Sequence, residues 1–144
     1  MKKTLTALII VVLFCGLLAP VASAAQKFSH VKKDENFDTY MDVGNIRKAN
    51  GVIYFWVKTM YSDSGRAIIR RDLPRRLRGA RIDYGMDYFE YDTNAELFRT
   101  SFCSVYDNKD TEVFREGSRK WRKIAPGSLA RLLIDNALRE IESK

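Results

Sequence analysis

The chain has 144 residues, of which 46% are hydrophobic and 12% aromatic, with 25 Lys and Arg against 18 Asp and Glu. This length suits a single domain, and the apolar content excludes an intrinsically disordered chain, because burial can offset the entropy lost on folding. The 8 Gly and 3 Pro are too few for a collagen-like or low-complexity protein. The composition therefore predicts one folded, basic domain.

The first 24 residues have the features of a cleaved export signal. A short basic start, Lys2-Lys3, precedes the uncharged stretch Leu5–Ala19, and Ala22-Ser23-Ala24 supplies the small residues that signal peptidase accepts. An uncleaved membrane anchor needs about 20 apolar residues, and this uncharged stretch is shorter. We expect cleavage after Ala24 and a mature protein that is periplasmic, outer-membrane-associated or secreted.

The cysteine content argues against an intrachain disulfide. Cleavage removes Cys15 and leaves Cys103 as the one cysteine of the mature chain. Cys15 could carry a lipid, but the bulky Phe14 before it disfavours that processing. Cys103 lies in an alternating apolar stretch, which favours a buried thiol, and an intermolecular bridge across a homodimer is the alternative. Loss of the two lysines of the signal leaves 23 basic residues against 18 acidic ones, a net charge of +5.

The mature chain is expected to begin with a charged, flexible leader at residues 25–36. Strands are predicted at Thr39–Val43 and Val52–Val57, with Asn50-Gly51 between them as a strong hairpin signal. The second of these strands is apolar on both faces, which is typical of a central strand covered on both sides. A partner subunit could supply the second cover.

A turn and a basic connector are expected next. Ser62-Asp63-Ser64-Gly65 has the composition of a turn, and Pro74 prevents a continuous helix over Arg66–Gly79. Three further strands are predicted at Tyr84–Tyr91, Leu97–Tyr106 and Glu112–Phe114. Simple alternation along the second of these puts Phe98, Phe102 and Tyr106 on one side and Leu97, Cys103 and Val105 on the other.

The chain is expected to end in a helix after the N-cap residue Ser128. Its apolar residues recur at helical spacing, namely Ala130, Leu133, Ile134, Ala137, Leu138 and Ile141. The strand connections are too short for crossovers, so neighbouring strands should be antiparallel. The predicted fold is α+β, a single antiparallel sheet of four to six strands with the C-terminal helix packed on one face, over residues 37–144.

The sequence contains few residues or motifs that are typical of a catalytic site. A single histidine, His30, makes triads, His-based acid–base pairs and three-ligand zinc sites hard to build. Asp83 and Asp87 flank Tyr84-Gly85 and could form a carboxylate pair, but a strand edge explains them equally well. No glycine-rich phosphate loop is present. We expect a protein that is not an enzyme and that has no cofactor and no metal site.

Arginine is concentrated in the basic connector, where seven arginines are opposed only by Asp72. They are Arg66, Arg70, Arg71, Arg75, Arg76, Arg78 and Arg81. A second basic cluster surrounds Trp121 and consists of Arg119, Lys120, Arg122 and Lys123. The guanidinium group pairs bidentately with phosphate, sulfate and carboxylate. In an exported protein this favours sulfated glycans, lipopolysaccharide phosphates or anionic lipid head groups over nucleic acid, and a merely solvated loop is the other interpretation.

Five segments resemble the surface-adhesin protein E-like domain family. They are Thr39–Ile46, Val52–Lys58, Tyr88–Asp92, Ser104–Asp107 and Trp121–Ser128, the last similar to the family's Trp-x-x-Ile-x-Pro-Gly-Ser. The resemblance extends over about Phe37–Ala137. It implies a small exported sheet-plus-helix domain that can dimerise through its sheet. It also implies an adhesin at the outer-membrane surface that binds extracellular matrix and serum proteins and heparin-like glycans.

Three functions are therefore carried forward, of which the third, an enzyme, would require titratable groups clustered in a cleft. The first is an exported, non-catalytic binding module that uses the arginine-rich connector against anionic glycans or matrix proteins. The second is a periplasmic structural or assembly protein of the cell envelope, whose working surface is an edge or face of the sheet.

Overall fold

A computed structural model describes residues 25–144, so the expected export signal at residues 1–24 lies outside the described residues. No helix within residues 25–144 combines the length and the apolar character needed to span a membrane. The strands are β1 (Phe28–Lys33), β2 (Phe37–Asp42), β3 (Arg47–Ala49), β4 (Val52–Tyr61), β5 (Tyr84–Asp92), β6 (Leu97–Tyr106), β7 (Glu112–Glu116) and β8 (Arg122–Lys123).

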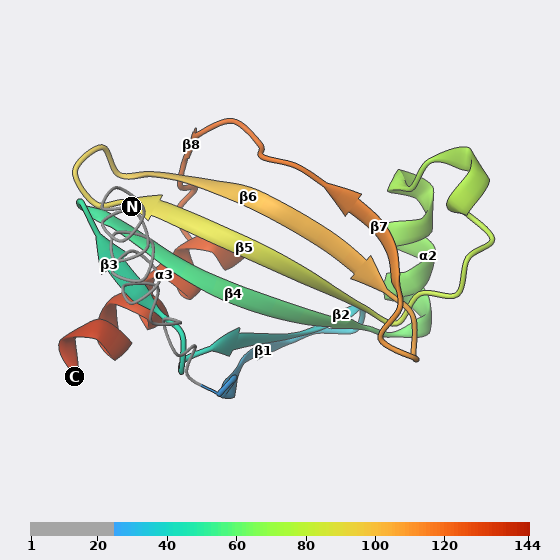
Figure 1. Ribbon diagram of the computed structural model, residues 1–144, viewed down its shortest axis with the longest axis horizontal. Coiled ribbons are helices and arrows are strands. Elements are labelled where there is room, and N and C mark those ends of the chain that lie inside the picture. Colours follow the sequence, from blue (N-terminus) through green and yellow to red (C-terminus); the bar gives the residue numbers. More distant parts are fainter. Residues whose placement is uncertain (1–24) are drawn as a thin grey trace, which may run out of the picture.

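All eight strands belong to one sheet, with the order β1-β2-β4-β5-β6-β7 and antiparallel pairing throughout. The short strand β3 pairs with β4, and β8 pairs with the beginning of β6. Figure 1 shows the sheet as a long, twisted layer. The α+β class and the single antiparallel sheet are confirmed, but the sheet has more strands than the four to six expected.

The additional strands are those whose sequences carry little apolar alternation. The expectation of a flexible leader at residues 25–36 is wrong for β1, which pairs with β2 from Phe28↔Asp42 to Lys33↔Asp38. Charged residues are common on edge strands because they discourage pairing with another chain. Because β1 is polar for this reason, its sequence has no apolar alternation that would predict a strand. The strands β3 and β8 span only three and two residues, too few for a periodic pattern.

Both α-helices lie on the same face of the sheet. In Figure 1, α3 (Leu129–Glu142) passes behind the strands at one end, and α2 (Asp63–Asp72) lies at the other end, followed by the 3-10 turn η1 (Arg75–Leu77). Ser128 caps α3 as predicted, since its side chain accepts a hydrogen bond from the backbone N–H of Arg131. The two helices thus cover separate parts of one face.

The hydrophobic core lies between this face and the helices. Under α3, Leu133, Ile134 and Ala137 are at most 1% exposed and belong to the same cluster as Phe55 and Ile53 of β4. Under α2, a second cluster consists of Tyr61, Leu73, Ile82 and Val105. The sheet face that α3 covers carries the odd-numbered residues Ile53, Phe55 and Val57 of β4.

A β-bulge corrects the predicted faces of β6. The register with β5 shifts between Tyr88 and Phe89, so that Phe98 pairs with Tyr91 whereas Phe102 pairs with Tyr88. The extra residue reverses the alternation midway along the strand. Phe98 therefore joins the core beside α3, and Phe102 lies on the opposite face, against the prediction that the two share a side.

Neither α2 nor α3 covers that opposite face, which carries half-buried aromatic side chains. The Trp56 ring lies 4.7 Å from the ring of Tyr88 and 5.8 Å from that of Phe102, between ring centroids. The Arg115 guanidinium lies over the Phe102 ring at 4.5 Å. We expected both faces of β4 to be covered, but no helix of residues 25–144 covers this second face.

Candidate functional site: an arginine-rich end and a cleft between the helices

The segment expected to be a turn and a connector begins with a helix. The Ser62 side chain accepts a hydrogen bond from the Gly65 N–H at 3.1 Å, which makes Ser62 the N-cap of α2. The prediction of a turn at Ser62-Asp63-Ser64-Gly65 is therefore wrong, because serine, aspartate and glycine are as common at helix N-termini as in turns. Pro74 acts as predicted, since α2 ends at Asp72 and only a 3-10 turn follows.

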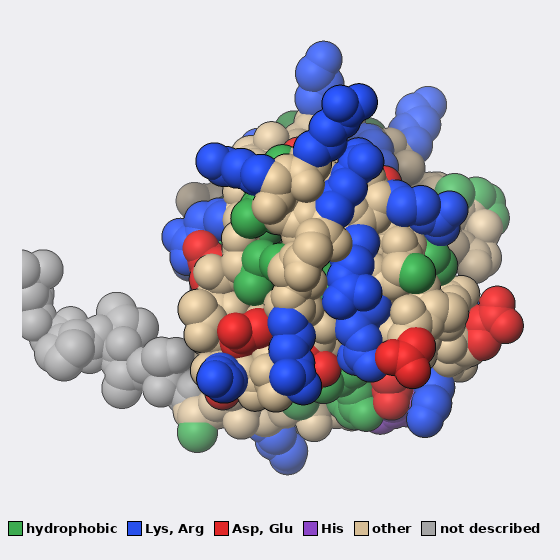
Figure 2. Space-filling model, turned by 90° about the vertical axis from the view of Figure 1, so that its right-hand side faces the viewer, with side chains coloured by type: hydrophobic (Ala, Val, Ile, Leu, Met, Phe, Trp, Pro, Cys, Tyr) green, Lys and Arg blue, Asp and Glu red, His purple; other side chains and the backbone are tan. Residues whose placement is uncertain are grey.

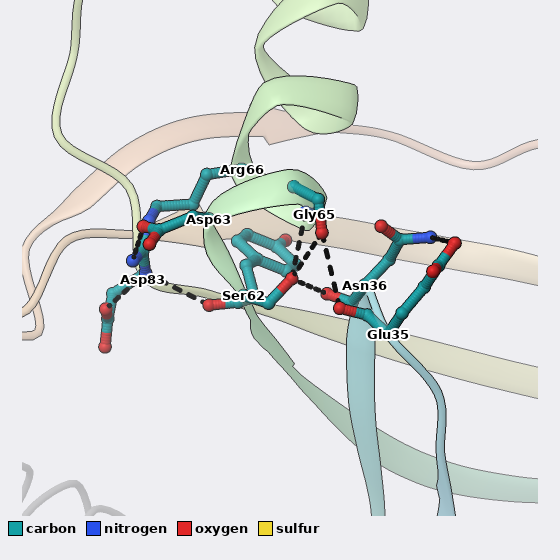
Figure 3. Close-up of polar contacts among 9 residues, drawn as sticks. Glu35, Asn36, Ser62, Asp63, Gly65, Arg66 and Asp83 are labelled. Carbon is teal, nitrogen blue, oxygen red and sulfur yellow. Dashed lines mark hydrogen bonds and ion pairs between the residues drawn. The ribbon is translucent and has the colours of Figure 1, made fainter.

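The N-terminus of α2 is fixed to two strand connections (Figure 3). The Ser62 hydroxyl donates to the carbonyl oxygen of Asn36, in the β1–β2 turn, at 3.1 Å. Arg66 donates to the Tyr61 carbonyl oxygen and forms ion pairs with Asp63 at 2.6 Å and Asp83 at 3.3 Å. Arg66 therefore has a structural role.

Two more arginines of the connector bond to the backbone of their own segment. Arg70 donates to the carbonyl oxygen of Ala80, and Arg78 donates to those of Leu73 and Arg71. These bonds join α2 to the chain beyond Pro74. The basic connector thus folds as an ordered unit that its own arginines hold together.

Four arginines are left with exposed side chains and no hydrogen bond or ion pair from their guanidinium groups to another described residue. They are Arg71, Arg75, Arg76 and Arg81. They project from α2, η1 and the segment before β5, and we call this surface the arginine-rich end. Figure 2, which faces this end of the molecule, shows Lys and Arg side chains gathered across it.

The second basic cluster lies elsewhere. Arg122 and Lys123 form β8 and pair with Phe98 and Leu97, at the beginning of β6, whereas α2 packs near Val105 at its end. Seven strand residues separate these positions, which corresponds to roughly 23 Å. Lys120 is exposed beside them. The fold therefore does not bring the two basic clusters into one surface.

Arg119 differs from its neighbours because it lines a cleft on the helix-covered face. The cleft has a volume of about 670 Å³ and lies between the last turn of α2 and the first residue of α3, with strands β2, β4, β5 and β6 beneath it. Ile69 and Leu73 contribute to one side, and Leu129 contributes to the other. The Arg119 guanidinium forms an ion pair with Glu116 at 2.8 Å, and both residues line the cleft.

Asp87 and Cys103 lie side by side on the floor of the cleft, directly opposite each other in the β5–β6 register. Burial raises the pKa of the Asp87 carboxyl, while the Cys103 thiol and the charge of Arg119 oppose this shift. Burial, together with the charge of Asp87, raises the pKa of the Cys103 thiol to about 12. The thiol is free and half-buried, so it is held in its protonated, unreactive form.

The strand-edge interpretation of Asp87 is wrong, and Asp83 and Asp87 form no pair. Asp83 bonds to Arg66, outside β5, whereas Asp87 lies within β5 between two neighbouring strands. One signal in the sequence marks Asp87, because it shares the inward side of the strand with Phe89 and Tyr91. The other residues of the cleft floor are far from Asp87 in the sequence, and only the pairing of the strands brings them close to it.

The structure also places the single histidine and bears on a possible metal site. His30 lies on β1 and pairs with Asp38 at 2.8 Å. Across residues 25–144, no group of three or more His, Cys, Asp or Glu side chains is arranged to hold a metal ion.

Searches against protein-family models, curated proteins and solved structures find no match to this chain.

Proposed function

We propose that this chain is an exported, non-catalytic binding module that recognises anionic glycans, or extracellular matrix and serum proteins, through the arginine-rich end. The observation that carries the proposal is the set of four exposed guanidinium groups with no acidic partner on one ordered unit. Export rests on the signal features of residues 1–24, and the adhesin-like function is what the resemblance implies.

The anchoring of this unit favours binding over simple solubility. Arg66, Arg70 and Arg78 are held by ion pairs and carbonyl oxygens, so the backbone that carries the four free arginines is fixed. Preorganised cations lose less conformational entropy when they bind than cations on a mobile loop. Each guanidinium also presents a planar fork that matches the oxygens of a sulfate or carboxylate group.

The test is calorimetric titration of the protein with a heparin oligosaccharide at about 150 mM salt. We compare the wild type with a variant in which Arg71, Arg75, Arg76 and Arg81 are changed to Ala. Because each guanidinium group that contacts a sulfate or carboxylate group adds to the affinity, loss of four should weaken binding by at least about tenfold.

The matched control removes four positive charges from the other end of the molecule, through Lys27→Ala, Lys48→Ala, Arg139→Ala and Lys144→Ala. Its net charge equals that of the arginine variant, so general electrostatic attraction falls equally in both. Retained binding in the control and loss in the arginine variant supports the proposal. Equal weakening in the two variants would show that net charge alone attracts the glycan.

The second candidate is a periplasmic structural or assembly protein that works through its sheet. The aromatic face around Trp56, Tyr88 and Phe102 favours it, because half-buried aromatic residues are common at protein interfaces. A homodimer through this face is one form. Sedimentation of the wild type and of Trp56→Glu tests it: a dimer that Trp56→Glu dissociates supports it, and a monomer at every concentration excludes it.

A further inference from the structure

The cleft between α2 and α3 has the size and wall chemistry of a small-molecule site. Its volume of about 670 Å³ lies within the range of roughly 300–1,000 Å³ that is typical of ligand pockets. Apolar side chains from four elements line it, including Phe37 of β2, Ile69 of α2, Phe114 of β7 and Leu129 of α3. This part of the cleft would contact the apolar body of a ligand.

The floor of the cleft is polar. The hydroxyl-bearing residues Thr39, Thr59 and Thr100 lie there together with Asp87 and Cys103, and all five come from the central strands. Polar groups on rigid strands at the base of an apolar cleft fix the orientation of a ligand. A ligand that fits this cleft therefore has an apolar body and one polar head.

The charges of the cleft are opposite in sign to that of the whole chain. Four carboxylates and two cations line it, namely Asp34, Asp72, Asp87, Glu116, Lys32 and Arg119. The ion pair of Arg119 with Glu116 neutralises one of each. Three carboxylates then face a single lysine, within a protein whose formal net charge is +7. The electrostatics favour a cationic head.

Asp87 is the group that would receive this head. Arg119 forms its ion pair with Glu116 and not with Asp87, so the Asp87 carboxylate has no ion pair within residues 25–144. Its neighbour across the strand pair is a thiol, which is a weak hydrogen-bond donor. A half-buried carboxylate without a direct ion-pair partner gains more from a bound ammonium group than an exposed carboxylate does.

We propose that the cleft between α2 and α3 binds a small amphiphilic amine, with its ammonium group on Asp87 and its apolar body between Ile69 and Leu129. This site shares α2 with the arginine-rich end but uses none of its four free arginines, and the arginine-rich end carries the opposite charge. The two sites would let one chain bind a polyanion and a small cation at once.

The probe is 4-phenylbutylamine, compared with two molecules of similar shape, 4-phenylbutanol and 5-phenylpentanoic acid. Binding to the purified protein is followed by amide chemical shifts in nuclear magnetic resonance spectra. The amine should bind at least about tenfold more tightly than the alcohol, and the acid more weakly still. The shifts should centre on residues of the cleft floor such as Thr59, Asp87 and Cys103.

The variants test the carboxylate. Asp87→Asn keeps the shape of the side chain and removes its charge, so it should weaken amine binding by at least about tenfold and leave alcohol binding unchanged. Asp72→Asn changes an exposed residue at the rim, which carries little risk for folding, and should weaken amine binding by only about twofold. Heparin binding by Asp87→Asn should equal that of the wild type, because Asp87 lies on the floor of the cleft. Asp72→Asn removes the one acidic side chain among the arginines of the connector, so its heparin binding should be equal to or tighter than that of the wild type.

Either of two results would overturn the proposal. One is equal affinity of the three probes, which would mean that the cleft does not discriminate charge. The other is amine binding that persists in Asp87→Asn or maps to the aromatic face of Trp56 and Tyr88. Since heparin binding is also measured on Asp87→Asn, failure here is distinguishable from failure of the arginine-rich end.

Discussion

At Gly65 the backbone of α2 lies close to the β1–β2 turn. A Cβ atom at this position would lie 2.1 Å from the carbonyl oxygen of Asn36, a backbone atom that cannot rotate away. Gly65→Ala should therefore push α2 from the β1–β2 turn and lower the free energy of unfolding by about 1–3 kcal/mol. Urea unfolding measures this change.

Gly79→Ala is the matched control, because a Cβ atom there would meet nothing within 4 Å. Its free energy of unfolding should stay within about 0.5 kcal/mol of the wild type. If both glycine variants unfold at the same urea concentration as the wild type, the close approach of α2 to Asn36 is contradicted.

Asp87 predicts a pH dependence of stability whose sign follows from its burial. Because its pKa in the folded protein is raised, the folded state holds this proton more tightly than the unfolded state does. Ionisation of Asp87 is therefore less favourable in the folded protein. As pH rises from the pKa that Asp87 has in the unfolded chain through its pKa in the folded protein, the free energy of unfolding falls. Asp87→Asn, which does not ionise, should have a higher melting temperature than the wild type at neutral pH.

The difference between the two proteins should shrink as pH falls toward 4, and thermal unfolding at several pH values checks this. The same trend in Asp72→Asn would contradict the assignment to Asp87, since Asp72 is exposed. A wild type that is more stable than Asp87→Asn at neutral pH would mean that a cation already pairs with the carboxylate.

At the scale of elements, α3 is held on the sheet by the apolar side chains of one of its faces. Leu133 is 1% exposed and Leu132, its neighbour, is 37% exposed. Leu133→Ala should lower the free energy of unfolding by about 2–5 kcal/mol, through lost burial and a new cavity. Leu132→Ala should change it by no more than about 0.5 kcal/mol, and equal losses in chemical denaturation would contradict the packing of α3.

The elements that the sequence predicts well are those with a strong period. The spacing from Ala130 to Ile141 predicts α3, and the bounds of β6, Leu97–Tyr106, agree with the prediction. The faces within β6 were predicted wrongly, because a single bulge reverses the alternation and nothing in the sequence marks it. The helix α2 was missed because its cap has the composition of a turn.

The candidate sites differ in how visible they are in the sequence. The arginine-rich end is contiguous in the chain, so composition alone locates it. Which arginines stay free depends on tertiary partners such as Asp83 and Ala80, and only the structure gives these. The cleft unites Thr39, Asp87 and Arg119, which are brought together by sheet register and the separation of the two helices.

At the scale of the whole molecule, charge is divided between a basic end and an acidic cleft. The four free arginines lie on the segment from α2 to β5, which Arg66, Arg70 and Arg78 hold in place. The cleft between α2 and α3 has more carboxylates than cations. A uniform basic surface would attract any polyanion weakly and without a preferred orientation. The anchored cluster instead predicts binding at one end of the molecule.

The most direct test of this account is the salt dependence of heparin affinity for the wild type, the four-arginine variant and the matched four-charge control. Each cation that contacts the glycan releases counterions, so the slope of log affinity against log salt counts the contacts. We predict that the control keeps the wild-type slope and that the arginine variant loses most of it. Identical slopes for all three proteins would contradict recognition by the arginine-rich end.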